Sequence, residues 1–161
     1  DRDRNTEIAD QIRAAGARIK FITDGDAPAA VSAGIAGSGV DMMLGIGGST
    51  EGVVAAVALK CIGGDFQGRL WPRDDGDREL AAKRGLDVNQ VLQLEDLVRG
   101  DDCMFAASGV TTGELLQGVQ YVAGGAVSDS LVMRSRSGTV RRIRTEHHWR
   151  KLQGIDATVN G

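Results

Sequence analysis

The sequence is poor in aromatic residues and contains no long hydrophobic run. Phe, Trp and Tyr make up 4% of the 161 residues, so the core of a single expected domain must rest on Ala, Val, Ile and Leu. No apolar run of about 18 residues and no signal peptide is recognised, so we expect a cytoplasmic protein without a membrane partner. The net charge of −3 argues against nucleic acid as the main partner.

Cysteine and histidine are scarce too. Cys61 and Cys103 lie far apart in the sequence and in apolar surroundings, which favours two buried thiols in a reducing compartment over a disulfide or a metal pair. His147 and His148 are adjacent, and neighbouring side chains rarely converge on one metal. No CxxC, HExxH or Ser/His/Asp pattern is recognised. Carboxylates and glycine turns are therefore the features most able to carry chemistry.

One glycine-rich stretch, GIGGSTEG at residues 45–52, stands between apolar residues 42–44 and 53–59. This pattern predicts a strand, a glycine turn and a helix. Glycine lets the backbone approach a ligand, and the free N–H groups of a helix N-terminus favour an anion. Neither GxGxxG nor GxxxxGK[ST] is present, so a dinucleotide site or a P-loop is poorly supported.

Glu51 places a carboxylate in the first turn of this expected helix, beside the expected anion. Two negative groups side by side suggest a cation between them, so our hypothesis is a phosphate site with a bound divalent metal. The alternative is that Ser49 or Thr50 caps the helix and Glu51 only complements its dipole.

A second turn of the same kind is Asp24-Gly25-Asp26, between an expected strand at 19–23 and an expected helix at 27–36. Its carboxylates can bind metal or accept hydrogen bonds from sugar hydroxyls, or they can simply cap the helix. Another strand is expected at 40–46. If these two strands are parallel, both turns lie at the same edge of the sheet, where ligands usually bind.

The other segments follow ordinary patterns. Residues 1–5 form a charged cluster, in which Arg2 and Arg4 either grip a phosphate or belong to a solvated charge run. Residues 131–143 alternate and turn at Ser137-Gly138, which predicts a β-hairpin whose arginines face solvent or a partner subunit. We also expect helices at 6–15, 79–84 and 114–119, a short helix within 88–100, strands at 66–71 and 104–107, and a glycine turn at 108–113.

Several motifs occur in a familiar order and spacing. They are DGD at 24–26, GIGGSTEG at 45–52, ALKC at 58–61 with Gly63-Gly64, QGRL at 67–70, Thr111 with GELL at 113–116, SLVMRS at 130–135 and SGTV at 137–140. Together they resemble the class II (GlpX-type) fructose-1,6-bisphosphatases. The resemblance covers residues 1–146, expected to be the C-terminal α/β half of the phosphatase. Residues 147–161 are then a polar tail, and the N-terminal metal-binding half is absent from this chain.

The resemblance implies a fold and an activity. The fold is a layered α/β sandwich with a mixed sheet, in the superfamily of fructose-bisphosphatase-like and inositol monophosphatase-like sugar phosphatases. The activity is hydrolysis of fructose 1,6-bisphosphate to fructose 6-phosphate and phosphate in gluconeogenesis, with Mn²⁺ or Mg²⁺. Some relatives also hydrolyse sedoheptulose 1,7-bisphosphate, and the full-length protein is expected to be a homodimer or homotetramer.

The resemblance also assigns roles by position. Glu51 matches the metal-binding glutamate, and substrate-binding positions are matched by Arg2, Asp3, Arg4, Asp24, Gly25, Asp26 and Gly48. No catalytic residue is expected within this chain, which should be inactive or weak alone. Thr50, Thr112 and Asn5 stand where the family usually has proline, aspartate and histidine. The competing interpretations are a non-catalytic module that binds sugar phosphates or regulates, and an assembly role for the arginine-rich hairpin.

Overall fold

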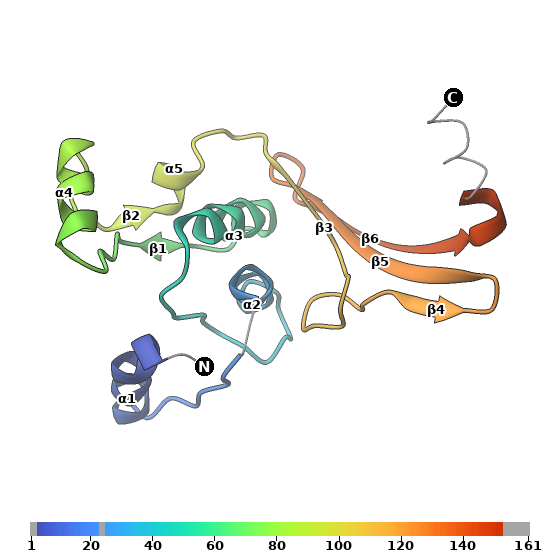
Figure 1. The fold of residues 1–161 in the computed structure, drawn as a ribbon, viewed down its shortest axis with the longest axis horizontal. Coiled ribbons are helices and arrows are strands. Elements are labelled where there is room, and N and C mark those ends of the chain that lie inside the picture. The colour runs from blue at the N-terminus through green and yellow to red at the C-terminus, as the bar shows by residue number, and fades with distance from the viewer. Residues whose placement is uncertain (1–2, 23–24, 153–161) are drawn as a thin grey trace.

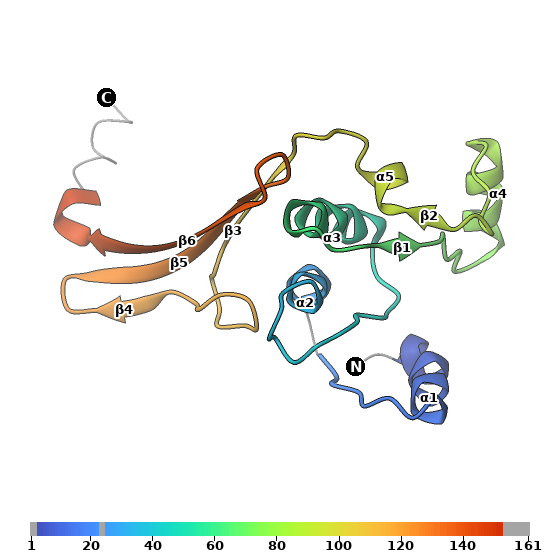
Figure 2. The same cartoon turned by 180° about the vertical axis from the view of Figure 1, so that it is seen from behind.

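Helix α3, Ser49–Ile62, lies at the centre of the molecule, and a four-stranded antiparallel sheet extends from one side of it (Figure 1). The computed structural model describes residues 3–22 and 25–152. Helix α2, Asp26–Ala33, packs beside α3 in both opposite views (Figures 1 and 2). Further elements are η1 Asp3–Asn5, α1 Thr6–Ala14, α4 Asp75–Lys83, α5 Leu94–Leu97, β1 Gln67–Gly68, β2 Leu92–Gln93, β3 Met104–Ser108, β4 Gln120–Val122, β5 Gly125–Arg134 and β6 Thr139–His148.

Small apolar residues let α3 and α2 approach closely. A Cβ on Gly34, at the end of α2, would lie 2.7 Å from Ile62 Cδ1 and 2.8 Å from Leu59 Cδ2, so glycine sets the spacing of the two helices. Helix α3 ends at Gly63, whose φ of 75° is left-handed, and Gly64 N–H donates to Leu59 O at 2.9 Å. The buried residues of α3 are Ala55, Ala56, Ala58, Leu59 and Cys61.

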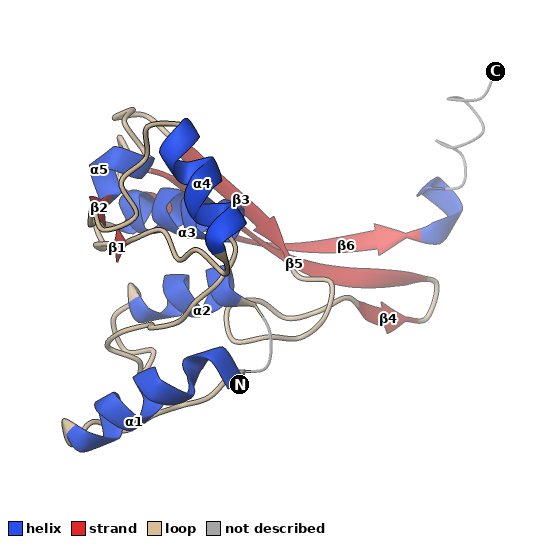
Figure 3. Cartoon of the chain, turned by 60° about the vertical axis from the view of Figure 1, so that its left-hand side comes forward, coloured by secondary structure: helices blue, strands red, loops and turns tan. Residues whose placement is uncertain are grey.

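Strand β5 is the centre of the sheet. It pairs with β3 and β4 and, over its whole length, with β6, always antiparallel. Leu131 and Met133 of β5 are fully buried against Val31 of α2 and against Ala58 and Cys61 of α3. This cluster attaches one face of the sheet to the helices, while the far ends of β5 and β6 extend beyond them (Figure 3).

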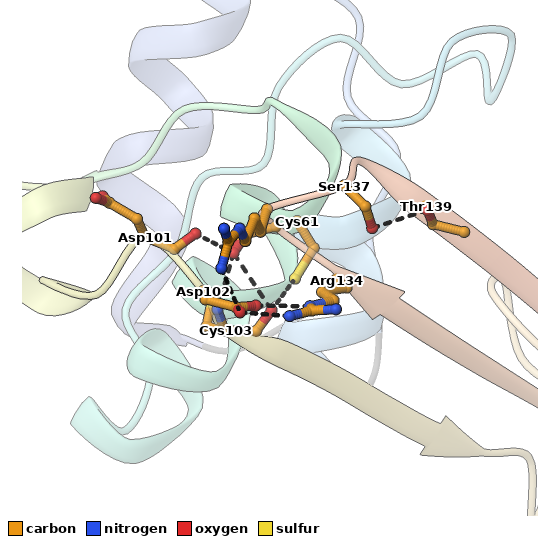
Figure 4. Close-up of polar contacts among 9 residues, drawn as sticks. Cys61, Asp101, Asp102, Cys103, Arg134, Ser137 and Thr139 are labelled. Carbon is orange, nitrogen blue, oxygen red and sulfur yellow. Dashed lines mark hydrogen bonds and ion pairs between the residues drawn. The ribbon is translucent and has the colours of Figure 1, made fainter.

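The two cysteines meet where β3 begins, although they are distant in sequence. Both are free thiols; Cys61 is buried, and its Sγ donates to the backbone oxygen of Cys103 at 3.6 Å (Figure 4). Burial, together with the neighbouring Cys103, raises the pKa of Cys61 to about 11. Beside them, Arg134 Nε donates to Asp102 Oδ1 at 2.7 Å, and the guanidinium lowers the pKa of that carboxyl.

The mixed α/β class is confirmed, and so are the helix at the N-terminus, the two helices after the polar turns, and the hairpin. The hairpin is longer than expected: β6 reaches His148, so His147 and His148 belong to the strand and not to a tail. The strand expected at 66–71 is reduced to Gln67–Gly68. No helix in the described part of the chain is long and apolar enough to cross a membrane.

The expected parallel pair of strands is wrong. The described residues 18–22 and 40–48 are irregular, and every strand pairing in the described chain is antiparallel. A parallel sheet needs both faces covered, whereas Phe21, Met42 and Leu44 are 48%, 70% and 56% exposed. The helix expected at 114–119 is also wrong, because this segment is a loop closed by a bond from Val119 N–H to Val110 O at 3.1 Å.

Candidate functional site

The N-terminus of α3 is open to a ligand. Gly48 is the N-cap residue, with φ −69° and ψ 145°, and no side chain caps the helix. Ser49 and Thr50 are the first two helical residues, so the alternative in which one of them caps α3 is wrong. The first N–H groups of an α-helix have no intrahelical partner. Residues 47–51 are exposed, and residues 47 and 48 carry no side chain.

The carboxylate of Glu51 folds back over this turn. A Cβ built on Gly48 would collide with Oε2 of Glu51, so the absence of a side chain at residue 48 makes room for the carboxylate. Glu51 is exposed, and its carboxylate oxygens are hard ligands of the kind that Mg²⁺ and Mn²⁺ prefer.

Asp26 reaches the same turn from another helix. It is the first residue of α2, after Gly25, whose φ of 86° is left-handed. A Cβ on Gly47 would collide with Oδ2 of Asp26, so this carboxylate lies over the glycine adjacent to Gly48. The structure therefore brings together the two turns that the sequence analysis expected to meet, although irregular segments and not parallel strands deliver them. Asp26 lies within the helix and does not cap it.

The N-terminal segment forms hydrogen bonds to Ile46, the residue before Gly47 and Gly48. Arg4 Nε donates to Ile46 O at 2.7 Å, and Ile46 N–H donates to Asn5 Oδ1 at 3.2 Å. Both backbone groups of Ile46 are thus held by two successive residues. Asp3 lies in η1 and is exposed. Arg2 and Asp24, also expected at the site, lie outside the described residues.

Asn5 is the contact that sequence reasoning missed. Its bond to Ile46 joins residues 41 positions apart, and no local pattern contains such a pairing. From the sequence alone, Asn5 is only a departure from the family pattern. In the structure it fixes the start of the glycine turn.

The residues present fit a divalent metal in part. Asp26 and Glu51 supply two carboxylates, and the described residues contain no group of three or more His, Cys, Asp or Glu side chains placed to hold an ion. Magnesium is often held by one or two carboxylates, with water and substrate phosphate as its other ligands. The site therefore suits an ion that shares its coordination with a phosphate.

The loop after the expected glycine turn at 108–113 contacts the segment that leads into this site. Lys20 Nζ donates to Glu114 Oε2 at 2.9 Å, so residues 113–116 are tied to the segment before Gly25. This ion pair is more than half exposed and contributes little stability by itself. It shows, however, that the loop lies beside the segment that contains Lys20.

Comparisons with known proteins agree over almost the whole chain. The family model of bacterial fructose-1,6-bisphosphatase, glpX-encoded, matches residues 1–147. A protein from Synechococcus sp. (strain JA-2-3B'a(2-13)) is 44% identical over 160 residues, which is 91% of this chain and 46% of the relative. A protein from Gloeobacter violaceus is 38% identical over 159 residues, with the same shares.

Both relatives are named D-fructose 1,6-bisphosphatase class 2/sedoheptulose 1,7-bisphosphatase. The chain spans about half the length of the curated relatives that it matches. The family model takes in every element from η1 almost to the end of β6, including both polar turns. This chain belongs to the family of bacterial, glpX-encoded fructose-1,6-bisphosphatases.

Proposed function

We propose that this chain is the C-terminal, substrate-binding part of a metal-dependent sugar bisphosphatase. The reaction is hydrolysis of fructose 1,6-bisphosphate to fructose 6-phosphate and phosphate. The observation that carries the proposal is that Asp26 and Glu51 lie over adjacent glycines at the uncapped N-terminus of α3. Sedoheptulose 1,7-bisphosphate is a second substrate in the proposal, because the relatives' names include both.

Each residue has a definite part in this proposal. Glu51 holds the metal, and the exposed first turn of α3 and Gly48 contact the substrate through backbone N–H groups. Asp26 and Gly25 bind sugar hydroxyls, together with Asp24. Arg2 and Arg4 hold the phosphate that is not cleaved, because guanidinium groups bind phosphate through paired hydrogen bonds. Asp3 belongs to the same substrate-binding segment.

A divalent ion, Mn²⁺ or Mg²⁺, supplies neutralisation of phosphate charge and activation of water when it is bound. The chain's own residues orient the substrate, so that the reacting groups are held in place and the step becomes effectively unimolecular. We propose that the remaining metal ligands and the water-activating residues come from an N-terminal half. Residues 1–148, up to the end of β6, then form the C-terminal α/β half.

The wider setting is proposed on the family resemblance. The reaction serves gluconeogenesis in the cytoplasm, and the full-length protein is a homodimer or homotetramer. A second candidate function is a non-catalytic module that binds sugar phosphates. It is favoured by one observation, that the described residues contain no group of three or more His, Cys, Asp or Glu side chains placed to hold an ion.

Phosphate release from fructose 1,6-bisphosphate in the presence of Mn²⁺ tests the proposal. We expect slow release by this chain, abolished in Glu51→Ala. The matched control is Asp75→Ala, which removes another carboxylate from the first turn of an exposed helix, α4. Release at the rate of a complete enzyme, unaffected by Glu51→Ala, would contradict it. Binding of substrate by a folded chain without any release would favour the binding module.

A further inference from the structure

A second polar depression lies between the sheet and the loop before β4. Its volume is about 330 Å³, and it is lined by residues 113–117 of the loop, by Asp129 of β5 and by Arg142 and Arg144 of β6. Neither Arg4, Asp26, Gly48 nor Glu51 lines it. The depression is therefore separate from the glycine turn at α3.

Two arginines of β6 face this depression. Residues two apart on a strand point to the same face, about 7 Å apart, so Arg142 and Arg144 lie on one face and Arg141 on the other. Arg142 Nη1 donates to Leu115 O at 3.4 Å, which holds its guanidinium against the loop. In the described part of the chain, neither Arg142 nor Arg144 forms an ion pair, in contrast with Arg134, which is paired with Asp102.

The two carboxylates of the depression are in different situations. Glu114 forms an ion pair with Lys20, with Nζ 2.9 Å from Oε2. Asp129 lies opposite Arg144 in the strand register but has no ion-pair partner among the described residues. An ionised carboxylate only accepts hydrogen bonds. The depression thus offers two forked cationic donors and one anionic acceptor.

We propose that this depression is a binding site for hydrogen phosphate. The guanidinium groups of Arg142 and Arg144 donate to the unprotonated phosphate oxygens. Asp129 accepts the hydrogen bond from the P–OH group, which hydrogen phosphate retains at neutral pH. Sulfate has no proton at this pH, so its oxygens repel the Asp129 carboxylate, and the site binds sulfate more weakly than hydrogen phosphate. The site is independent of the proposed hydrolase activity.

Amide chemical shifts in a phosphate titration test the proposal on the unmodified chain. Sodium phosphate and sodium sulfate are compared at equal ionic strength and neutral pH. We expect saturating shifts with phosphate at residues 113–117 and 142–144, and binding of sulfate at least about tenfold weaker. Equal binding of the two anions, shifts that do not saturate, or shifts confined to the α3 turn would overturn the proposal.

Three variants separate the site from a general charge effect. Arg144→Ala should weaken phosphate binding by about tenfold or more, because it removes a charge-assisted pair of hydrogen bonds. Arg141→Ala is the matched control: it removes the same charge from the same strand on the opposite face, and phosphate affinity should not change. Asp129→Asn should remove the preference for phosphate over sulfate. An equal loss in Arg141→Ala and Arg144→Ala would overturn the proposal, and so would an unchanged preference in Asp129→Asn.

Discussion

At the scale of single residues, two glycines decide where the carboxylates of the candidate site lie. Gly47 and Gly48 have no left-handed φ, so glycine is not needed there for backbone strain. It is needed for space, because Asp26 and Glu51 occupy the positions that a Cβ would fill. Glycine in this turn is thus explained by the carboxylates that lie over it.

The first prediction concerns Gly48→Ala. The added Cβ should displace the Glu51 carboxylate while the fold is retained, and Mn²⁺ affinity should fall by about tenfold, as it does when groups that orient a ligand are lost. Isothermal titration calorimetry with Mn²⁺ measures this affinity. Gly45→Ala is the control, since its Cβ would meet only Met43 Cε at 3.6 Å, an ordinary contact. Equal affinities of Gly45→Ala and Gly48→Ala would contradict the explanation.

Cys61 gives a prediction on pH. Its thiol has a pKa of about 11 in the folded chain, above the ordinary value of 9.0, because burial disfavours the thiolate. Because the pKa of Cys61 is raised in the folded chain, the stability that its neutral thiol contributes is fully present below pH 9. This contribution is lost as the pH rises towards 11. The urea midpoint of the parent should therefore fall more over this window than that of Cys61→Ala. Parallel pH dependence of the two proteins would count against a buried neutral thiol.

Local chemistry at single residues could be predicted from the sequence, but the partners of those residues could not. Glu51 in a first helical turn and a buried Cys61 follow from local patterns. The bonds of Arg4 and Asn5 to Ile46 do not, because they depend on how two distant segments pack.

At the scale of elements, most of the helices and the hairpin could be predicted, whereas the helix expected at 114–119 and two of the expected strands are irregular in the described residues. Helix α3 has local signals, with a glycine turn before it and Gly63-Gly64 after it. The β5–β6 hairpin has alternation and a Ser-Gly turn, and Gly138 takes a left-handed φ of 58°. The segments 19–23 and 40–46 are apolar, but a strand forms only where a neighbour accepts its hydrogen bonds, and no local pattern reports that neighbour.

The packing of α2 on α3 gives a prediction at this scale. Gly34→Ala should lower the free energy of unfolding by about 1–3 kcal/mol, because the new Cβ overpacks against Leu59 and Ile62. Urea denaturation measures the change. Gly100→Ala is the control, because a Cβ there meets nothing within 4 Å. A Gly34→Ala variant as stable as Gly100→Ala would mean that the helices are not in close contact.

At the scale of the whole molecule, large apolar side chains remain exposed on several elements. Leu44 precedes the glycine turn, Met104 lies on β3, and Tyr121 on β4 is 80% exposed and packs against Trp149 with ring centroids 6.3 Å apart. The relatives are more than twice as long as the region that they share with this chain. We therefore propose that the activity needs a chain of the relatives' length, to which the described residues contribute binding of the substrate.

The central claim is that Glu51 and its neighbours bind a sugar bisphosphate together with a metal. Titration of the chain with fructose 1,6-bisphosphate, with and without Mn²⁺, tests it most directly. The account predicts binding that strengthens with Mn²⁺ and loses this dependence in Glu51→Ala, while Asp75→Ala behaves as the parent. Binding that is the same with and without Mn²⁺, or a Mn²⁺ effect that survives Glu51→Ala, would contradict it.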